Sequence, residues 1–430
     1  MSNNEERIIR SGTFDWLTIF IYLIMVGWGF LAIYSADFDT NSPSIFSLSH
    51  SYGRQIIWIG VSLVIALVIL LLDHRIYPAF GYIIYGIVIL SLVSVFFLVT
   101  KRVGGGLSWF EIGSFKFQPS EFAKFATALA LAKYLSGYGI SFKDTKTQLI
   151  CFGIVLLPMA LVLLQNDTGS ALVFTAFFLA LFREGLSGIW LFSALYAGIL
   201  FLASILVEDI NIILLTLTAI AVLIFLLVRK NRSAVFILVA VWVLSCGFSY
   251  SVDYLYNNVL KDHQRQRIEV MLGRVDDIKG VGYNVYHSKV AIGSGGIYGK
   301  GFLQGTQTRL RYVPEQNTDF IFCTIGEEYG FVGSFGLVIL FVSLLIRIVQ
   351  IAERQRSRFN RVYAYGVASV IFLHFTINLS MTVGLFPVVG IPLPFFSYGG
   401  SSLLSFTIML FILIRLDANR TNEVKRAFEI

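Results

Sequence analysis

The chain has 430 residues, of which 56% are hydrophobic and only 14% are charged, and its mean hydropathy is +0.76. A composition this apolar excludes a water-soluble globular domain and predicts a polytopic membrane protein. The formal net charge of +7 comes mostly from basic residues in short loops between apolar segments, so we expect no nucleic acid among the partners.

Apolar windows of roughly 17 to 25 residues, enough to cross about 30 Å of hydrocarbon, recur along nearly the whole chain. About twelve are predicted, at residues 15–35, 54–72, 76–99, 120–135, 148–164, 169–182, 186–207, 211–228, 234–251, 319–346, 362–385 and 401–414. The windows that begin at Ser120 and Gly169 are short or marked by Pro and Gly, which is typical of helices that line a cavity. The sequence therefore predicts one all-α polytopic membrane domain over residues 1–430, with about 10 to 12 transmembrane helices.

Basic residues in the short loops predict the orientation of the helices. They gather on one side when the N-terminus is placed in the cytoplasm, and the C-terminus then lies in the cytoplasm as well. The opposite face holds four segments, 101–117, 165–168, 253–318 and 387–400. The third of these is a large extracytoplasmic loop.

A glycine-rich segment, GSGGIYGKG at 293–301, lies in this large loop and contains Lys300. It does not match a nucleotide-binding P-loop, because Lys300 is followed by Gly301 instead of Ser or Thr, and no strand precedes it. Two interpretations stay open. The glycines form backbone turns, or they let N–H groups and Lys300 approach an anion closely.

Asp319 stands in the polar stretch VPEQNTDFIF, where the large loop meets an apolar window. Carboxylates are rare at such a boundary unless they serve a function. Asp319 can cap the helix that follows. Alternatively, Glu315, Glu327 and Glu328 crowd the same boundary, and like charges with partial desolvation raise a carboxylate pKa toward the range of a general base.

Glu121 and Lys124 lie three residues apart in FQPSEFAKFA, on one face of a helix that Pro119 is suited to begin. One interpretation is an ion pair that stabilises a cavity-lining helix. The other is a path for a polar head group, to which Lys124 supplies positive charge. The two are compatible.

Two further polar or irregular segments interrupt the apolar windows. Asp167 in QNDTGS is predicted to cap a helix after a tight turn. The segment 384–402, GLFPVVGIPLPFFSYGGSS, contains three prolines and is too apolar to be freely solvated. We predict re-entrant backbone that lines a cavity.

Together these motifs resemble the SEDS family (shape, elongation, division and sporulation). The segments that carry the resemblance are FQPSEFAK, QNDTGSALV, HQRQRI, GYNVYHSKVAIGSGGIYGKGFLQGTQT, VPEQNTDFIF, GEEYGFVG and PVVGIPLPFFSYGGSS. They span most of the chain in family order, and GTQT at 305–308 is more similar to elongation-type than to division-type members. The resemblance implies a SEDS-type helical bundle and a peptidoglycan glycosyltransferase that polymerises lipid II at the outer face of the bacterial cytoplasmic membrane during cell-wall elongation.

The resemblance also implies partners and residue roles. It gives Asp319 the catalytic position and makes Glu121 and Lys124 required positions. Lipid II, membrane lipids and a class B penicillin-binding protein, which supplies the transpeptidase, are the implied partners. The candidates for substrate binding are Glu121, Lys124, Lys300, Arg309, Arg311, Asp167 and Ser401.

Our hypothesis for the mechanism is that Asp319 accepts the proton of the acceptor 4-hydroxyl while that oxygen displaces the lipid pyrophosphate from the anomeric carbon, with inversion. A leaving pyrophosphate needs positive charge, which Lys124, Lys300, Arg309 and Arg311 offer. A divalent ion such as Mg²⁺, held by Asp319 and a nearby glutamate, is an equal alternative, although no dedicated metal motif is visible. Otherwise we expect no cofactor.

Two other function classes stay open, a lipid II transporter and a non-catalytic scaffold. Intramembrane Glu and Lys suit a transporter equally well, but a transporter site belongs near the midplane, whereas these motifs cluster on one face. A scaffold would tolerate Asp319→Asn. Within the enzyme class, a division-type polymerase is the alternative to an elongation-type one.

Three features depart from the family pattern. Ser108 stands before Trp109 where an Arg is usual, so a phosphate contact there would fall to Lys101, Arg102 or Lys116. Asn166 replaces a proline before Asp167. Finally, the family usually has ten helices. Either the segment 189–251 contains an added helix pair, or two of the predicted windows belong to one kinked helix.

Overall fold

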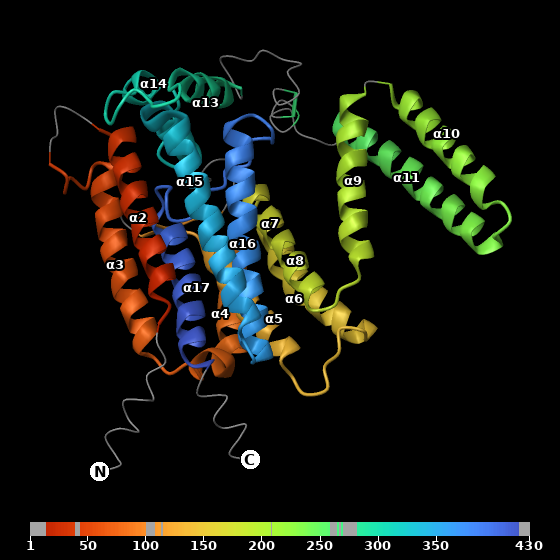
Figure 1. The fold of residues 1–430 in the computed structure, drawn as a ribbon, viewed down its shortest axis with the longest axis horizontal. Helices are drawn as coiled ribbons and strands as arrows, with labels where there is room; N and C mark the ends of the chain where they lie inside the picture. The colour runs from red at the N-terminus through yellow and green to blue at the C-terminus, as the bar shows by residue number, and fades with distance from the viewer. Residues whose placement is uncertain are drawn as a thin grey trace, which may run out of the picture. The chain divides into compact units, whose positions relative to one another are not determined.

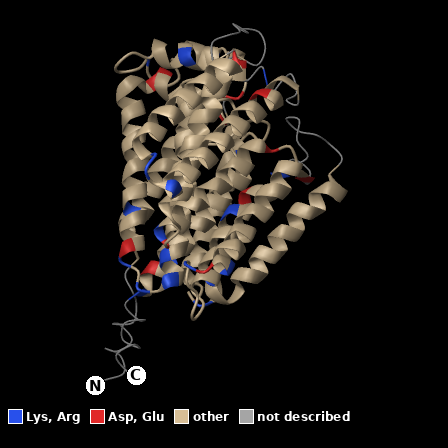
Figure 2. Ribbon diagram, turned by 90° about the vertical axis from the view of Figure 1, so that its right-hand side faces the viewer, with Lys and Arg blue, Asp and Glu red and all other residues tan. Residues whose placement is uncertain are grey.

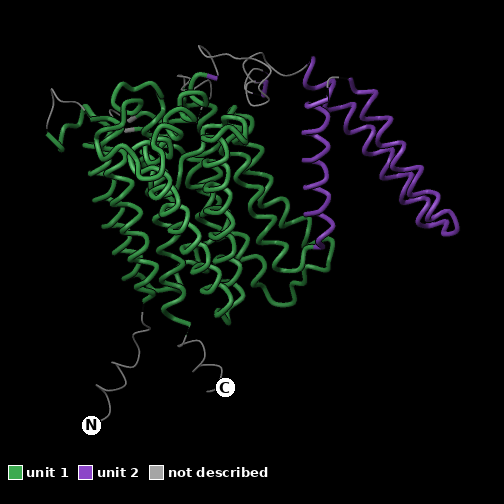
Figure 3. The backbone as a smooth tube through the Cα atoms, turned by 45° about the horizontal axis from the view of Figure 1, so that its top comes forward, with its two compact units in different colours: residues 1–186, 283–430 green, residues 187–282 purple. Residues whose placement is uncertain are grey.

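The fold was analysed in a computed structural model of the chain, which describes residues 14–38, 44–99, 108–112, 115–207, 209–258, 265, 268–269 and 282–420. The chain forms two compact units (Figure 3). Unit 1 contains residues 1–186 and 283–430, and unit 2 contains residues 187–282.

Unit 1 is a helical bundle with one short hairpin (Figure 1). Its helices are α2 (Trp16–Ala36), α3 (Ser51–Leu71), α4 (Ile76–Leu98), α5 (Pro119–Leu135), α6 (Thr145–Leu164), α7 (Thr168–Val173), η1 (Phe174–Ala176), α8 (Phe177–Arg183), α13 (Tyr283–Ser294), α14 (Thr306–Arg309), α15 (Ile321–Glu353), α16 (Arg358–Thr382) and α17 (Gly400–Ala418). The antiparallel hairpin pairs β1 (Phe110–Ile112) with β2 (Phe115–Phe117).

The described residues contain 10 helices that are long and apolar enough to cross a membrane. The all-α polytopic fold is therefore confirmed. Two predicted windows fall outside this set. The first is α5, at 17 residues, and the second is the segment Thr168–Arg183, which a 3₁₀ turn divides. These are the two windows that the sequence marks as short.

The centre of unit 1 is built from α5, α16 and α17, which pack on one another. In α16 and α17, 78% and 83% of the membrane-spanning window is buried, against 22% in α3. Alanines along α5 permit close helix packing, which favours association inside a membrane. Polar residues on these three helices are consequently shielded from lipid.

One end of unit 1, where α2 begins and α17 ends, is held together by ion pairs. Asp15 accepts hydrogen bonds from Arg347 and Arg354, and Arg354 also binds Asp417, with a distance of 2.9 Å from its Nε. The carboxylates of Asp15 and Asp417 are 1% and 0% exposed. Figure 2 shows acidic and basic residues together at the end nearest the two termini.

A similar cluster joins the end of α8 to α16 in this unit. Glu184, directly after α8, binds Arg358 and Arg361 at 3.2 and 2.9 Å.

The ion pairs of the first cluster also affect the pKa of Asp15. Burial would raise the pKa of the Asp15 carboxyl, but hydrogen bonds from Arg347 and from the Thr18 N–H outweigh this effect and hold that pKa below its ordinary value. The ion pairs fix the ends of helices that are distant in sequence.

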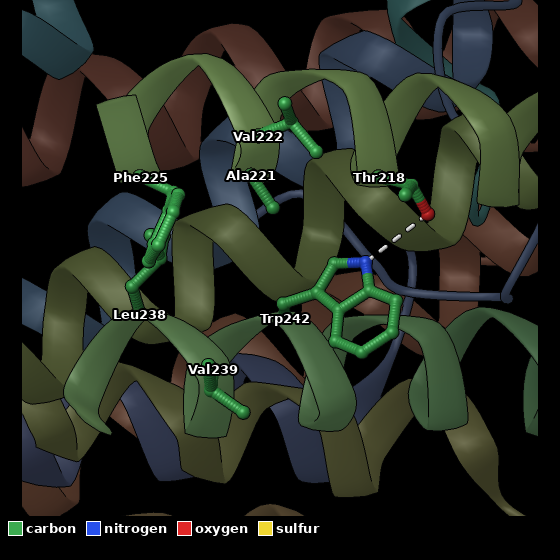
Figure 4. A pocket seen from close by; sticks show the side chains of 7 residues that line it. All are labelled: Thr218, Ala221, Val222, Phe225, Leu238, Val239 and Trp242. Atoms are coloured by element: carbon green, nitrogen blue, oxygen red, sulfur yellow. Dashed lines mark hydrogen bonds between the residues drawn. The ribbon is translucent and has the colours of Figure 1, made fainter. Parts of the chain in front are cut away.

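Unit 2 consists of α9 (Gly188–Leu206), α10 (Ile210–Val228) and α11 (Arg232–Asn258). A pocket of about 210 Å³ lies between α10 and α11 (Figure 4). Its lining is apolar apart from Thr218 and Trp242, which bind each other at 3.2 Å. It offers no charged group to a phosphate or sugar.

Three predictions about the organisation of the chain stay predictions. They are the added helix pair within 189–251, the loop boundaries 253–318 and the single domain over 1–430.

We expect Asp417→Asn to destabilise the protein by about 1 to 3 kcal/mol, because the substitution removes one of the two buried carboxylates that bind Arg354, while Arg354 keeps Asp15 and can still reach water. The measurement is the thermal melting temperature of the purified protein in detergent. Glu353→Gln is the matched control. Its ion pair with Arg183 is about half exposed on both sides, so the melting temperature should change little. Equal losses in both variants would contradict the structural role of the buried cluster.

Candidate functional site

The loop between α16 and α17, residues 383–399, lies beside several of the sequence-predicted site residues, among them Asp319. It is largely non-helical, yet Ile391, Leu393 and Phe396 are at most 1% exposed. This buried, irregular course agrees with the prediction of re-entrant backbone. Its carbonyls and N–H groups must find partners inside the protein, because lipid offers none.

Asp319 lies directly against this loop. Asn378 of α16 donates its Nδ2 to the Asp319 carbonyl at 2.8 Å, and Ser397 donates its hydroxyl to the Thr318 carbonyl at 2.6 Å. Gly390 has a φ of +70°, and a Cβ added there would lie 3.3 Å from Asp319 Oδ2. The loop thus fixes the backbone of Asp319 and leaves room for its half-buried carboxylate.

The capping interpretation of Asp319 is not supported by the helix geometry. Helix α15 begins at Ile321, and its N-cap is Phe320, which makes no side-chain capping bond. Asp319 therefore stands one position before the cap.

Glu121 and Lys124 form a buried ion pair on α5. The distance from Lys124 Nζ to Glu121 Oε1 is 2.7 Å, and the two side chains are 0% and 2% exposed. The same ammonium lies 2.9 Å from His374 Nε2 on α16 and 4.9 Å from the ring centre of Phe406 on α17. The predicted ion pair is confirmed, and it is shared among all three central helices.

Asp167 and Ser401 are joined through Gln118, the residue before α5. Gln118 donates its Nε2 to Asp167 Oδ2 at 2.8 Å and its backbone N–H to the Ser401 hydroxyl at 3.1 Å. Asp167 also caps α7 by accepting from Ser170 N–H at 3.0 Å, so the capping prediction is confirmed. Burial raises the pKa of the Asp167 carboxyl, against the opposing effect of hydrogen bonds from Ser170 and Gln118.

Gly169 brings the start of α7 against the same loop. A Cβ added to Gly169 would collide with the carbonyl oxygen of Val389. Only glycine permits this approach, which explains the small residue after Asp167. The loop therefore contacts α7 on one side and Asp319 on the other.

Lys300 and the glycine segment serve the protein's own backbone and carboxylates. The N–H groups of Lys300 and Gly301 donate to the carbonyls of Glu327 and Glu328 at 3.0 and 2.9 Å. The ammonium of Lys300 pairs with Glu327 Oε1 at 2.7 Å. Of the two open interpretations, these contacts favour turns that pack on α15 over a cradle for an anion.

Glu327 also organises α14, which contains most of the GTQT motif. Its carboxylate is 0% exposed and accepts from the N–H groups of Gln307 and Thr308, both at 2.9 Å. Glu328 accepts from Ser35 of α2 and from the Leu303 N–H. Both glutamates hold the large loop in place, which differs from the predicted role of crowding Asp319.

The two arginines of this loop differ in their contacts. Arg311 pairs with Asp37 at 3.0 Å and is 54% exposed. Arg309 is exposed at the end of α14, and its side chain makes no hydrogen bond or ion pair with the part of the chain that the structure describes. Lys116 pairs with Glu111 at 3.5 Å, and the alternatives Lys101 and Arg102 lie outside the described residues.

A comparison with known families covers nearly the whole chain. The family model described as "Cell cycle protein", for FtsW, RodA and SpoVE, matches residues 15–216 and 199–422. The chain belongs to the FtsW/RodA/SpoVE family. The resemblance to the SEDS family is thereby confirmed.

Curated members of the FtsW/RodA/SpoVE family align over almost their full length. The chain is 33% identical to "Peptidoglycan glycosyltransferase RodA" of Treponema pallidum, over 96% of this chain and 100% of the relative. It is 32% identical to "Peptidoglycan glycosyltransferase MrdB" of Escherichia coli, over 94% and 93%. A probable FtsW of Coxiella burnetii is 28% identical, over 97% and 100%. The greater similarity to RodA and MrdB agrees with the elongation-type GTQT motif.

Solved structures of the family share the fold. The structure "Structural coordination of polymerization and crosslinking by a peptidoglycan synthase complex" contains a chain that is 26% identical, with a TM-score of 0.69, covering 95% of this chain and 98% of that one. The crystal structure of the rod shape determining protein RodA of Thermus thermophilus is 25% identical, with a TM-score of 0.60 and the same coverage. These matches confirm a polytopic helical membrane fold.

The sequence analysis did not identify three residues that contact the predicted site residues or the loop. They are His374, Asn378 and Gln118. His374 and Asn378 lie one helical turn apart in a membrane-spanning helix, and a polar pair at that spacing is a usable signal. Gln118 carries no comparable signal, because it stands between a hairpin and a helix.

The donor set for a divalent ion is limited. Among the described residues, no three His, Cys, Asp or Glu side chains are grouped so that they could hold a metal ion. Glu327 and Glu328 are engaged as described above, and Glu315 accepts from Thr318 at 2.9 Å. Mg²⁺ commonly uses one or two carboxylates and substrate phosphates. An ion at Asp319 would fit only if the substrate and water supplied most of its ligands.

Proposed function

We propose that Asp319 is the catalytic carboxylate of this chain, which is a peptidoglycan glycosyltransferase of cell elongation like the RodA and MrdB relatives. The observation that carries the proposal is the fixed position of Asp319, whose backbone is bound by Asn378 while Gly390 leaves space beside its carboxylate. A general base has to be held where it can reach the hydroxyl proton.

The substrate we infer is lipid II, with the growing glycan strand as the second reactant. Asp319 takes the proton from the acceptor 4-hydroxyl, and that oxygen forms the new bond to the anomeric carbon of the donor. The bond from this carbon to the pyrophosphate oxygen breaks, and the lipid pyrophosphate leaves with the electron pair. A single displacement of this kind inverts the configuration at the anomeric carbon.

Exposed arginines are the cations we assign to the leaving pyrophosphate. Arg309 and Arg311 are exposed, whereas Lys300 is paired with buried Glu327. Lys124 is 0% exposed and bound to Glu121, so we assign it to shaping the site instead of direct contact in this conformation. Preorganised charge of this kind stabilises the transition state.

The geometry favours an enzyme over a transporter. Asp319 lies just before the first turn of α15, while Arg347 and Arg354, near the other end of this 33-residue helix, are tied to buried Asp15 and Asp417. A transporter has to open at both ends in turn. The buried ion pairs hold one end of the bundle closed.

The partner and location follow the same reasoning. A solved relative belongs to a peptidoglycan synthase complex that couples polymerisation with crosslinking. We therefore propose a class B penicillin-binding protein, a transpeptidase, as the partner. We also propose the bacterial cytoplasmic membrane as the location, with both termini in the cytoplasm, because the basic loops lie on that side.

Asp319→Asn tests the catalytic role. We expect loss of glycan-strand formation from labelled lipid II, roughly 100-fold or more, because the amide has nearly the same size but no basic oxygen. The measurement is polymer formed by the purified protein, with and without its penicillin-binding partner. An unchanged melting temperature shows that the variant is folded. Equal polymer from variant and wild type would move the base to another residue.

Gly390→Ala tests the space beside the carboxylate. We expect reduced polymerisation, because the added methyl group lies 3.3 Å from Asp319 Oδ2. Gly139→Ala is the matched control. Gly139 has a φ of +71°, almost the same as Gly390, but open space around its Cβ position. Both variants should lose about 1 kcal/mol of stability from backbone strain. Equal activity in the two variants would argue against the crowding.

Chelation tests the divalent ion. If Asp319 acts as a base without a metal, polymerisation in EDTA should stay within about twofold of the untreated rate. If Mg²⁺ links Asp319 to the pyrophosphate, activity should vanish and return on addition of Mg²⁺. The assay is the same polymer measurement, with a metal-independent transpeptidase assay of the partner as the control.

A further inference from the structure

A continuous set of polar contacts connects Lys124 to the backbone at Asp319, and His374 stands in the middle of it. His374 is 1% exposed and lies on α16, the central helix. Its Nε2 is 2.9 Å from Lys124 Nζ, and its Nδ1 is 3.1 Å from the Pro392 carbonyl oxygen. The imidazole therefore spans from α5 to the loop.

These two contacts determine the protonation of the ring. The Lys124 ammonium has only hydrogens to donate, so His374 Nε2 has to accept. The carbonyl of Pro392 can only accept, so Nδ1 carries the proton and donates. His374 is thus a neutral imidazole in the Nδ1–H form, with each nitrogen matched to a different partner.

The next turn of the same helix continues the connection. Asn378 donates its single Nδ2 group to two carbonyls, that of Ile391 at 2.7 Å and that of Asp319 at 2.8 Å. His374 and Asn378 therefore hold consecutive carbonyls of the loop, those of Pro392 and Ile391. Gly390, directly before them, is the residue against which the Asp319 carboxylate lies.

We propose that His374 is a positioning residue that sets the placement of the Gly390–Pro392 segment, and through it the Asp319 carboxylate, relative to the Lys124–Glu121 pair. The ring of Phe406 packs edge-on against His374, with 4.9 Å between ring centres, and restricts the tilt of the imidazole. This inference rests on the proposed role of Asp319. It predicts that loss of the two-sided contact slows the reaction more than it weakens substrate binding.

His374→Leu, His374→Asn and His374→Gln test this proposal. Leucine fills space but makes neither contact, and asparagine stays polar but is too short to reach both partners. Glutamine can accept from Lys124 with its oxygen and donate to Pro392 with its nitrogen. We expect a kcat loss of roughly 10- to 100-fold for Leu and Asn, with KM for lipid II nearly unchanged, because a small misplacement of a catalytic group has this size of effect. Glutamine should restore kcat to within about threefold of wild type.

Tyr363→Phe is the matched control on the same helix. Tyr363 is fully buried and donates its hydroxyl to the Met409 carbonyl at 3.0 Å, outside the His374 contacts. This variant should lose melting temperature without loss of kcat. A kcat loss in Tyr363→Phe that matches its loss of stability, or the same kcat in the Leu, Asn and Gln variants, would overturn the proposal and leave His374 a packing residue.

Asp319→Asn, measured in parallel, separates the proposed catalytic role of Asp319 from the proposed positioning role of His374. If it is inactive while His374→Leu keeps the wild-type kcat, only the positioning role fails. If it polymerises normally, the proposed base is wrong, and a kcat loss at His374 would then point to a reaction centre at another residue that this segment positions. If His374→Leu does not fold, the comparison of the polar Asn and Gln variants decides.

Discussion

Irregular backbone inside a membrane protein has to satisfy its hydrogen bonds with protein groups, because lipid offers none. The loop between α16 and α17 meets this requirement with side chains of α16 and with its own Ser397. Asn378, His374 and Ser397 bind carbonyls of the loop or of residues 318–319. A Gln55 oxygen lies near the N–H of Gly399 at 3.5 Å. The side chains that satisfy the hydrogen bonds of the loop therefore also fix the backbone of residues 318 and 319.

The glycines near the loop make room for different groups. Gly390 adopts a positive φ and leaves space beside a carboxylate, whereas Gly169 permits contact with a carbonyl of the loop. The glycines at 295–301 instead pack on the backbone of α15 at its kink, where Gly330 also has a positive φ. At each of these glycines another group comes close to the backbone, but only Gly390 lies beside the Asp319 carboxylate.

Interactions between residues close in sequence could be predicted, whereas interactions between distant residues could not. Apolar windows depend on local composition, so every predicted helix is present, and the Asp167 cap and the Glu121–Lys124 pair lie within four residues of their partners. The contact of Lys124 with His374 joins residues 250 apart, and that of Glu327 with Lys300 joins residues 27 apart. No local pattern specifies such pairings. For this reason the sequence left two interpretations open for the segment of Lys300 and did not indicate that Glu327 binds Lys300 and α14.

The buried pair of Lys124 and Glu121 is difficult to explain by stability alone. Removing two charges from water costs several kcal/mol per ion, and an apolar replacement of similar volume is often equally stable or more stable. The two side chains are nevertheless 0% and 2% exposed, and Glu121 Oε2 has no hydrogen-bond partner among the described residues. Lys124 engages Glu121, His374 and the face of Phe406, one on each central helix. The buried Lys124 ammonium contacts residues of all three central helices. We therefore explain the buried pair by its effect on the register of α5, α16 and α17 around the loop of residues 383–399.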